Sequence, residues 1–229
     1  MNLYKSIALL CFSMIFSSCN GQNKTAMTKE TTNTNPLLCD TETGICGVPE
    51  TAGKPSAIVQ NSEKPVKVIY FTDPICSSCW GIEPQLRKLK LEYGANIEME
   101  YRMGGLLPDW SYNSGGISKP SDVAHHWDEA SQYYDMPIDG DVWLEDPLNS
   151  SYPPSIAFKA AQLQDQENAV QFMREMSELL FLKKKNIEKW ENMALAAKAS
   201  GLNVAQLKTD FEGKAKALFE EGLKTAKEY

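Results

Sequence analysis

The sequence predicts an α/β protein, in which a strand–helix–strand unit is followed by a long helical region. Residues 66–71, VKVIYF, are dense in β-branched and aromatic residues, which is typical of a buried strand. Residues 97–103, IEMEYRM, alternate between apolar and polar side chains, as a half-buried strand does. Between them, residues 77–93 carry apolar side chains at helical spacing and end at Gly94. Such a unit places its two strands parallel.

The first 18 residues are interpreted as a lipoprotein-type signal peptide. Lys5 supplies a positive start, and the apolar run from Ile7 to Phe16 is too short to span a bilayer comfortably. The run ends in Phe16-Ser17-Ser18-Cys19, which is similar to the bacterial lipoprotein signal, in which the cysteine becomes the lipidated N-terminus. A plain signal peptide and an uncleaved anchor are the alternatives. We therefore expect a lipid on Cys19 and a membrane-anchored protein in an extracytoplasmic, periplasm-facing location.

Residues 19–63 are expected to form a flexible tether, because their first part is polar, rich in Thr and Asn, and has no apolar face. The tether contains CDTETGIC, in which a disulfide between Cys39 and Cys46 would close a small loop. Such a bond would contribute about 2.5 kcal/mol in the chain-entropy model. A second redox pair that exchanges with the later cysteines of the chain is an equally supported interpretation.

Cys76 and Cys79 form a C-x-x-C pair where the first predicted strand turns into a helix. At a helix N-terminus, the unpaired backbone N–H groups and the helix dipole stabilise a thiolate and lower its pKa. Cys76 is therefore the predicted nucleophile, and Cys79 the thiol that resolves a mixed disulfide. An inert disulfide between Cys76 and Cys79 is disfavoured. A zinc site that these two share with Cys39 and Cys46 is also disfavoured, because the six residues between Cys39 and Cys46 are more than zinc ligand pairs usually have. We expect neither a metal nor a cofactor.

Residues 104–202 are predicted to form loops and a helical insertion, and residues 203–229 a helix that returns to the strand–helix–strand unit. The expected helices lie near 123–134 and over 154–164, 167–183, 187–199 and 203–227. Asn203 is the predicted N-cap of the last helix, with Gln206 at the reciprocal capping position. His125 and His126 are interpreted as packing residues, because adjacent helical residues point about 100° apart and make poor co-ligands.

Pro84 adds a further feature, because it lies eight residues after Cys76 within the predicted helix. With strand, C-x-x-C and helix in this order, the chain resembles the thioredoxin superfamily. DPICSSCWGIEPQLRKL followed by YRMGGL is similar to the DsbA-like subgroup, which includes FrnE-type oxidoreductases and cytosolic protease adaptors. The resemblance covers residues 64–229. It implies a thioredoxin-like fold with an inserted helical domain, in which residues 64–103 supply the first half.

Three features depart from the family pattern. Tyr70 stands where many thioredoxins have a buried carboxylate, so no proton-accepting residue is assigned. Ser77-Ser78 differ from the Pro-His pair of strongly oxidising DsbA, so the oxidising strength is not carried over. The cis-proline loop, β-hairpin and last helix of the family have no counterpart before Tyr229, because the available prolines come too early: Pro137, Pro147, Pro153 and Pro154. We expect the sequence to be a truncated piece.

The expected function is that of an extracytoplasmic thiol–disulfide oxidoreductase that acts on cysteine-containing polypeptides. Its partners would be substrate proteins, an unidentified redox-recycling partner and, through the lipid, the membrane. A net charge of −7 argues against nucleic acid as a partner. Two alternatives remain. One is a non-catalytic adaptor on the same fold, and the other is a small-molecule isomerase, although such relatives often lack the second cysteine.

Overall fold

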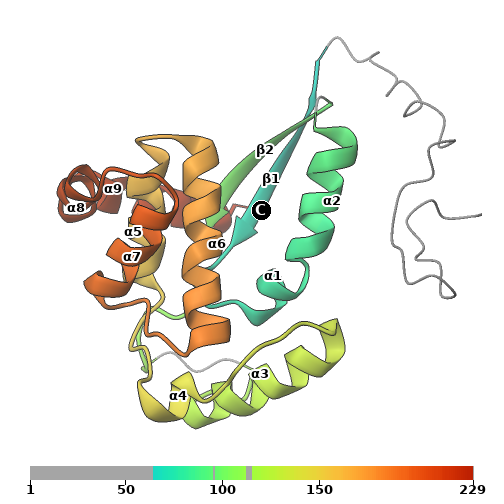
Figure 1. The fold of residues 1–229 in the computed structure, drawn as a ribbon, viewed down its shortest axis with the longest axis vertical. Helices are drawn as coiled ribbons and strands as arrows, with labels where there is room; N and C mark the ends of the chain where they lie inside the picture. Colours follow the sequence, from blue (N-terminus) through green and yellow to red (C-terminus); the bar gives the residue numbers. More distant parts are fainter. Residues whose placement is uncertain (1–63, 95, 112–114, 229) are drawn as a thin grey trace, which may run out of the picture. The chain divides into compact units, whose positions relative to one another are not determined.

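The computed structural model describes residues 64–94, 96–111 and 115–228. These residues form two parallel strands, a helical connection between them, and a group of helices beside the sheet (Figure 1). The predicted signal peptide and tether, with Cys19, Cys39 and Cys46, lie outside the described residues. The predicted order of a strand–helix–strand unit followed by a helical region is confirmed.

The sheet contains β1 (Val66–Thr72) and β2 (Ile97–Met103), in a parallel register that pairs Val66 with Ile97 and Thr72 with Met103. Because the strands are parallel, both end at the same edge of the sheet. The segment that carries the cysteine pair therefore starts next to the loop that follows β2. A hydrogen bond from Gly104 N–H to the Thr72 carbonyl, 2.8 Å long, joins these two exits.

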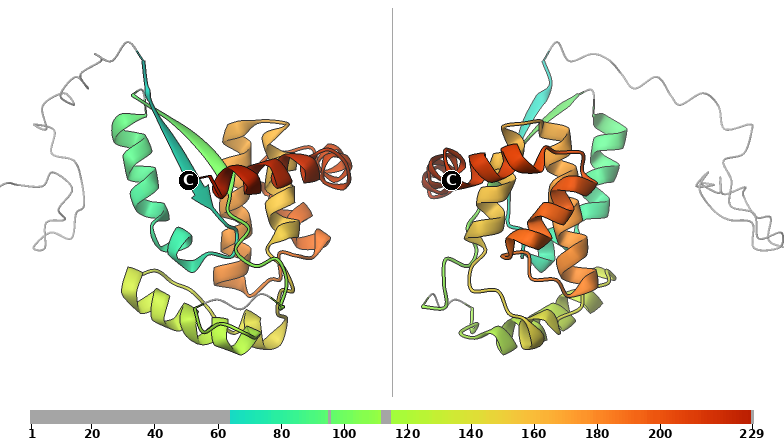
Figure 2. Two further views of the ribbon diagram at one scale, coloured as in Figure 1. Left: turned by 180° about the vertical axis from the view of Figure 1, so that it is seen from behind. Right: turned by 60° about the vertical axis from the view of Figure 1, so that its left-hand side comes forward.

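The helix predicted over residues 77–93 is interrupted, which corrects the expectation of one continuous helix. α1 (Ser77–Gly81) and α2 (Glu83–Tyr93) meet at Ile82, whose φ and ψ are −94° and 1°. Pro84 explains the break, because it has no N–H to continue the ladder of α1 and instead occupies the first turn of α2. In Figures 1 and 2, α2 runs along the strands, whereas α1 lies at their end, against α3.

The helices after β2 are, in chain order, α3 (Pro120–Tyr134), α4 (Val142–Glu145), α5 (Tyr152–Gln162), α6 (Gln166–Lys183), α7 (Trp190–Ala199), α8 (Val204–Glu212) and α9 (Ala215–Ala226). α4 falls in a stretch predicted as loop. The single helix expected over 203–227 is wrong, because the chain breaks at Gly213, whose φ and ψ of −111° and −113° lie far from helical values. After this break, α9 lies beside β2 and α5 (Figure 2).

The start of α8 confirms half of the predicted cap. Asn203 Oδ1 accepts the Gln206 N–H at 3.0 Å. The reciprocal half is wrong, because the Gln206 amide donates to Asp210 Oδ2 at 2.9 Å instead of reaching back to Asn203. The helix predicted from residue 187 also starts later, at Trp190.

An aromatic cluster joins α1 to the helical region. Trp127 packs against Phe181, with ring centroids 4.5 Å apart, and against Trp143 at 5.3 Å. Trp80 of α1 stacks on Phe181, with ring centroids 5.6 Å apart, and its Nε1 donates to the Pro137 carbonyl at 3.1 Å. All four rings are buried. Close aromatic pairs add about 0.5–1.5 kcal/mol beyond area burial, so the cysteine-bearing helix is held firmly by the insertion.

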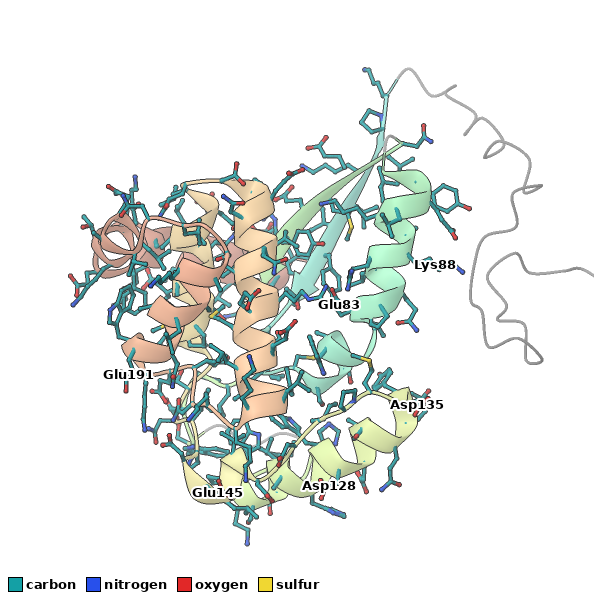
Figure 3. All side chains as sticks on the ribbon, in the orientation of Figure 1. Glu83, Lys88, Asp128, Asp135, Glu145 and Glu191 are labelled. Atoms are coloured by element: carbon teal, nitrogen blue, oxygen red, sulfur yellow. The ribbon has the colours of Figure 1, made fainter. Side chains whose placement is uncertain are left out.

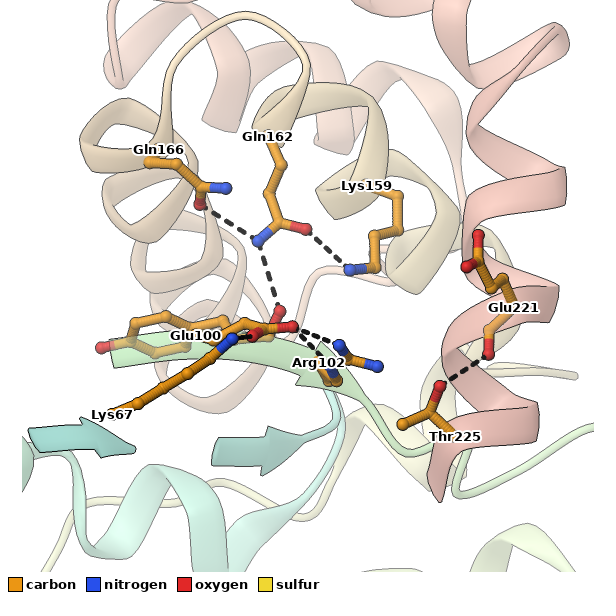
Figure 4. A network of polar contacts seen from close by, with 9 residues as sticks. Lys67, Glu100, Arg102, Lys159, Gln162, Gln166, Glu221 and Thr225 are labelled. Atoms are coloured by element: carbon orange, nitrogen blue, oxygen red, sulfur yellow. Dashed lines mark hydrogen bonds and ion pairs between the residues drawn. The ribbon is translucent and has the colours of Figure 1, made fainter. Parts of the chain in front are cut away.

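The outer edge of β2 is covered by side chains of α5 (Figure 4). Gln162 Nε2 donates to the Tyr101 carbonyl at 3.3 Å, and Gln162 Oε1 accepts from Lys159 Nζ at 2.9 Å. On the strands, Lys67 and Glu100 form an ion pair at 2.7 Å. The Tyr101 carbonyl is therefore paired by α5 and is not available to another strand at this edge.

Charged side chains cover the outer faces of the helices, as Figure 3 shows for Lys88, Asp128, Glu145 and Glu191. Of the helices that the structure describes, none combines the length and the apolar character needed to cross a bilayer. Glu83 differs from the other labelled residues, because it points from α2 toward α6, where its carboxylate lies 3.7 Å from Arg174.

Candidate functional site

The cysteine pair lies where β1 ends and α1 begins. Cys76 is the N-cap residue of α1, with φ and ψ of −78° and 106°, and its Sγ accepts the Cys79 N–H at 3.3 Å. Both residues are half-buried free thiols, and their sulfurs are hydrogen-bonded to each other. The N-cap bond gives the Cys76 sulfur a backbone donor, which is the arrangement that stabilises negative charge at a helix start.

The pair keeps one of its two thiols at a low pKa. The hydrogen bond from Cys76 lowers the pKa of Cys79 to about 6, with further contributions from the hydroxyls of Thr72 and Tyr70. The same bond, together with burial, raises the pKa of Cys76. The expectation placed the low pKa on Cys76 instead. Because the two sulfurs share a proton, the first ionisation belongs to the pair, and the charge moves between the sulfurs as the proton does.

Tyr70 lies on β1 beside Cys79. Its hydroxyl is buried and makes no hydrogen bond of ordinary length and angle within the described chain. Burial raises the pKa of Tyr70, and the neighbouring Cys79 adds to this rise. The Tyr70 hydroxyl therefore stays protonated and is available as a donor to a charged Cys79 sulfur. From the sequence, Tyr70 was notable only because it stands where many thioredoxins have a buried carboxylate.

Asp73 is the site residue that the sequence analysis missed. It lies in the turn between β1 and α1 and is 6% exposed. Its Oδ1 accepts the Ile75 N–H at 3.1 Å, and its Oδ2 accepts the Leu106 N–H at 2.7 Å. Ser151 Oγ donates to the same Oδ2 at 2.8 Å. Desolvation raises the pKa of Asp73 to about 6, although these hydrogen bonds act in the opposite direction.

A cavity of about 450 Å³ opens beside the pair, between the sheet, α2 and α6. Cys76, Cys79 and Tyr70 line it at one end. Its volume is in the range of small-molecule sites. Its other walls combine apolar and charged side chains, among them Leu86, Met173, Arg87, Lys90 and Arg174.

A second, largely apolar groove of about 670 Å³ borders Cys76 between α1, α3 and the loop after β2. Buried apolar side chains form its floor, and Leu106, which is 50% exposed, stands at its rim. The floor residues are Ile75, Leu107, Val123 and Trp127. Cys76 therefore borders both the cavity and the groove, and the lining of the groove also includes the acidic side chains of Asp122 and Glu129.

His125 and His126 lie on the exposed side of α3, so their interpretation as packing residues is wrong. Their side chains are 79% and 50% exposed and lie 3.5 and 4.0 Å from the Glu129 carboxylate. Both contribute to the rim of the apolar groove. Within the described ranges, no group of three or more His, Cys, Asp or Glu side chains is placed to hold a metal ion.

Sequence comparison relates the chain to thioredoxins and to adapter proteins. A model of the family described as Thioredoxin matches residues 70–229. The ClpXP adapter protein SpxH of Halalkalibacterium halodurans is 40% identical over 189 residues, which are 80% of this chain and 61% of the relative. The SpxH protein of Bacillus subtilis is 33% identical over 155 residues, 67% of this chain and 50% of the relative. The chain thus spans between half and about three fifths of these relatives.

Solved structures share the fold at low sequence identity. A candidate protein disulfide isomerase from Nitrosomonas europaea superposes with a TM-score of 0.63 at 19% identity, over 72% of this chain and 79% of that one. The cytosolic disulfide reductase DsbM from Pseudomonas aeruginosa gives a TM-score of 0.58 at 18% identity, over 71% and 77% of the two chains. Together with the family match, these likenesses confirm the predicted thioredoxin-like fold with a helical insertion.

Proposed function

Because the chain belongs to the thioredoxin family, we propose that it is a polypeptide-binding protein of the adapter type, which holds cysteine-containing client proteins beside Cys76. The observation that carries this proposal is the 40% identity over 189 residues to a ClpXP adapter protein. The apolar groove next to Cys76 supplies a surface for an extended client segment. Such a segment would place apolar side chains in the groove and a cysteine at its end.

A charged side chain at the rim of the groove tests this proposal. We suggest Leu106→Asp, with Leu195→Asp as the matched control, because Leu195 is 58% exposed on α7 and does not line the groove. The probe is fluorescently labelled ribonuclease A, reduced and unfolded. Leu106→Asp is expected to weaken binding by about tenfold, the size of a single interface anchor. Binding that is equal in the wild type and both variants, or equally lost in both, would overturn the proposal.

The location of the chain decides which clients it meets. The signal at residues 1–18 supports lipidation of Cys19 and an extracytoplasmic domain. We therefore propose that the clients are exported proteins and that delivery to ClpXP is not part of this chain's role. Cells grown with an alkyne-bearing palmitate should label the wild type but not Cys19→Ser. Label retained in Cys19→Ser would contradict the lipid anchor.

Thiol–disulfide exchange is the second candidate function, favoured by the free thiols at the N-cap of α1. When the shared proton is on Cys79, the Cys76 thiolate would attack a client disulfide, so that a Cys76–client bond forms, the client bond breaks and one client sulfur leaves as a thiolate. Cys79 then gives up its proton to the departing client sulfur and attacks the Cys76 sulfur, which closes the Cys76–Cys79 disulfide and releases the second client sulfur as a thiol. Two electrons pass from the pair to the client, and the reverse sequence oxidises a client. The chain retains both cysteines, which disfavours the small-molecule isomerase alternative.

Trapping separates the two candidates. Cys79→Ser should accumulate a covalent complex with oxidised, scrambled ribonuclease A, because no thiol remains to resolve the mixed disulfide. Cys76→Ser should not. If both variants bind the probe without a covalent complex, exchange is overturned and the adapter proposal stands.

A further inference from the structure

We propose that Asp73 is a positioning residue of the cysteine pair: its buried carboxylate fixes the turn before Cys76 against the helical insertion and opposes negative charge on the two sulfurs. This inference deepens the exchange function proposed above and rests on it. The Asp73 carboxylate contacts neither sulfur by an ordinary hydrogen bond. Its partners instead come from three separate parts of the chain.

One side of Asp73 shapes the turn itself. Oδ1 accepts the Ile75 N–H at 3.1 Å, and the Asp73 carbonyl accepts the Cys76 N–H, also at 3.1 Å. The turn between β1 and α1 is therefore closed by the side chain and the main chain of a single residue. Its conformation sets the direction in which the Cys76 side chain leaves the helix start.

The other carboxylate oxygen attaches this turn to distant segments. Leu106 of the loop after β2 and Ser151, the N-cap residue of α5, both donate to Oδ2, and Ser151 lies 78 residues away in the chain. Ser151 Oγ also accepts the Leu107 N–H at 3.1 Å. The network is closed and mostly buried, so it holds the turn before Cys76 and the start of α5 in one hydrogen-bonded unit.

The charge of Asp73 has no counter-ion in the described chain. All of its hydrogen-bond partners are neutral, and no Lys, Arg or His carries an ion pair to it. The titratable groups that face it are Cys76 and Cys79 on α1 and Tyr152 on α5. An ionised carboxylate near a thiolate raises the free energy of the reduced, charged pair. The dithiol consequently gives up its electrons more readily than it would beside a neutral residue.

The test compares Asp73→Asn with Ser151→Ala in the full chain, equilibrated with glutathione and glutathione disulfide. Both variants lose hydrogen bonds of the same network, but only Asp73→Asn loses the charge. We expect Asp73→Asn to shift the equilibrium about tenfold toward the dithiol, which is about 30 mV for a two-electron couple. Ser151→Ala should shift it by less than about twofold. Equal shifts in the two variants would overturn the inference, because a merely structural role would affect both alike.

Failure of the exchange function and failure of the variant to fold can each be told apart from equal shifts in the two variants. A wild-type pair that does not equilibrate reversibly with glutathione overturns the exchange function, and the inference with it. If Asp73→Asn does not fold, carbon-13 NMR of wild-type protein labelled at its Asp carboxyls replaces it. Because linkage is reciprocal, the pKa of Asp73 should be higher in the dithiol than in the disulfide form. The same pKa in both forms would overturn the inference.

Discussion

Trp80 stacks on Phe181, with ring centroids 5.6 Å apart and ring planes within 10° of parallel. Trp80 directly follows Cys79 in α1, whereas Phe181 lies in the last turn of α6. Both side chains are buried, with 7% and 1% exposure. The helix that carries the cysteine pair is thus seated on the insertion, and the sheet alone does not determine its position.

Removal of this stacking contact should destabilise the whole domain. We expect Trp80→Ala to lower the free energy of unfolding by about 3–5 kcal/mol, because it deletes a buried aromatic side chain and leaves a cavity. Tyr133→Ala serves as the control, because Tyr133 is 82% exposed and its loss should cost less than about 0.5 kcal/mol. Urea unfolding of both variants measures the difference. Equal losses would show that α1 is not seated on Phe181.

The elements of the fold could be predicted where a periodic pattern dominates. Val66–Thr72 and Ile97–Met103 appear as strands because their residue types and alternation are local properties of the sequence. The breaks were harder to predict. The sequence places Pro84 inside one predicted helix, but it lies in the first turn of a new one, and Gly213 divides the predicted last helix. Helical periodicity continues across both positions, so periodicity does not reveal where the hydrogen-bond ladder stops.

The candidate site was predictable only in part, for the same reason. The position of Cys76 at the start of α1 follows from a local strand-to-helix pattern. Asp73 owes its role to partners 33 and 78 residues away, Leu106 and Ser151, which no local pattern connects to it. A lone acidic residue at the end of a predicted strand indicates a turn, and only the folded chain shows that its carboxylate is buried.

Gly81 provides a test of how closely α1 approaches α3. A Cβ atom built on Gly81 would lie 2.3 to 2.8 Å from side-chain carbons of Tyr134. We expect Gly81→Ala to destabilise the fold by about 1–3 kcal/mol, although alanine is the better helix former. In the Tyr134→Ala background the same substitution should be neutral or stabilising. Thermal unfolding of the four proteins gives the coupling energy, and simple additivity would contradict the close approach.

Gln162 tests whether α5 protects the edge of β2. Gln162→Met keeps the length of the side chain but removes its bonds to the Tyr101 carbonyl and to Lys159 Nζ. We expect a loss of about 1–3 kcal/mol in the free energy of unfolding, because two half-buried polar groups lose their partner. Gln171→Met, on the exposed side of α6, is the matched control and should stay near the wild type. If Gln171→Met lost as much stability as Gln162→Met, the loss would come from the methionine itself, and the prediction would fail.

The pH dependence of stability should reveal the buried carboxyl of Asp73. Its pKa is about 6 in the folded chain, compared with the ordinary value of 3.8. Because the folded state binds this proton more tightly, its contribution is fully present below pH 3.8 and is lost as the pH rises through about 6. The advantage of the wild type over Asp73→Asn should therefore shrink by about 3 kcal/mol between pH 3.5 and pH 7.

A control of opposite sign strengthens this measurement. The Ser118 N–H and hydroxyl hold the pKa of Asp122 below its ordinary value. The advantage of the wild type over Asp122→Asn should consequently be present at neutral pH and fade as the pH falls. Urea unfolding at a series of pH values, applied to the wild type and both variants, compares the two trends. A flat trend for Asp73 would show that its carboxyl is solvated, and a trend parallel to that of Asp122 would show that its pKa is lowered; either result would contradict the raised pKa.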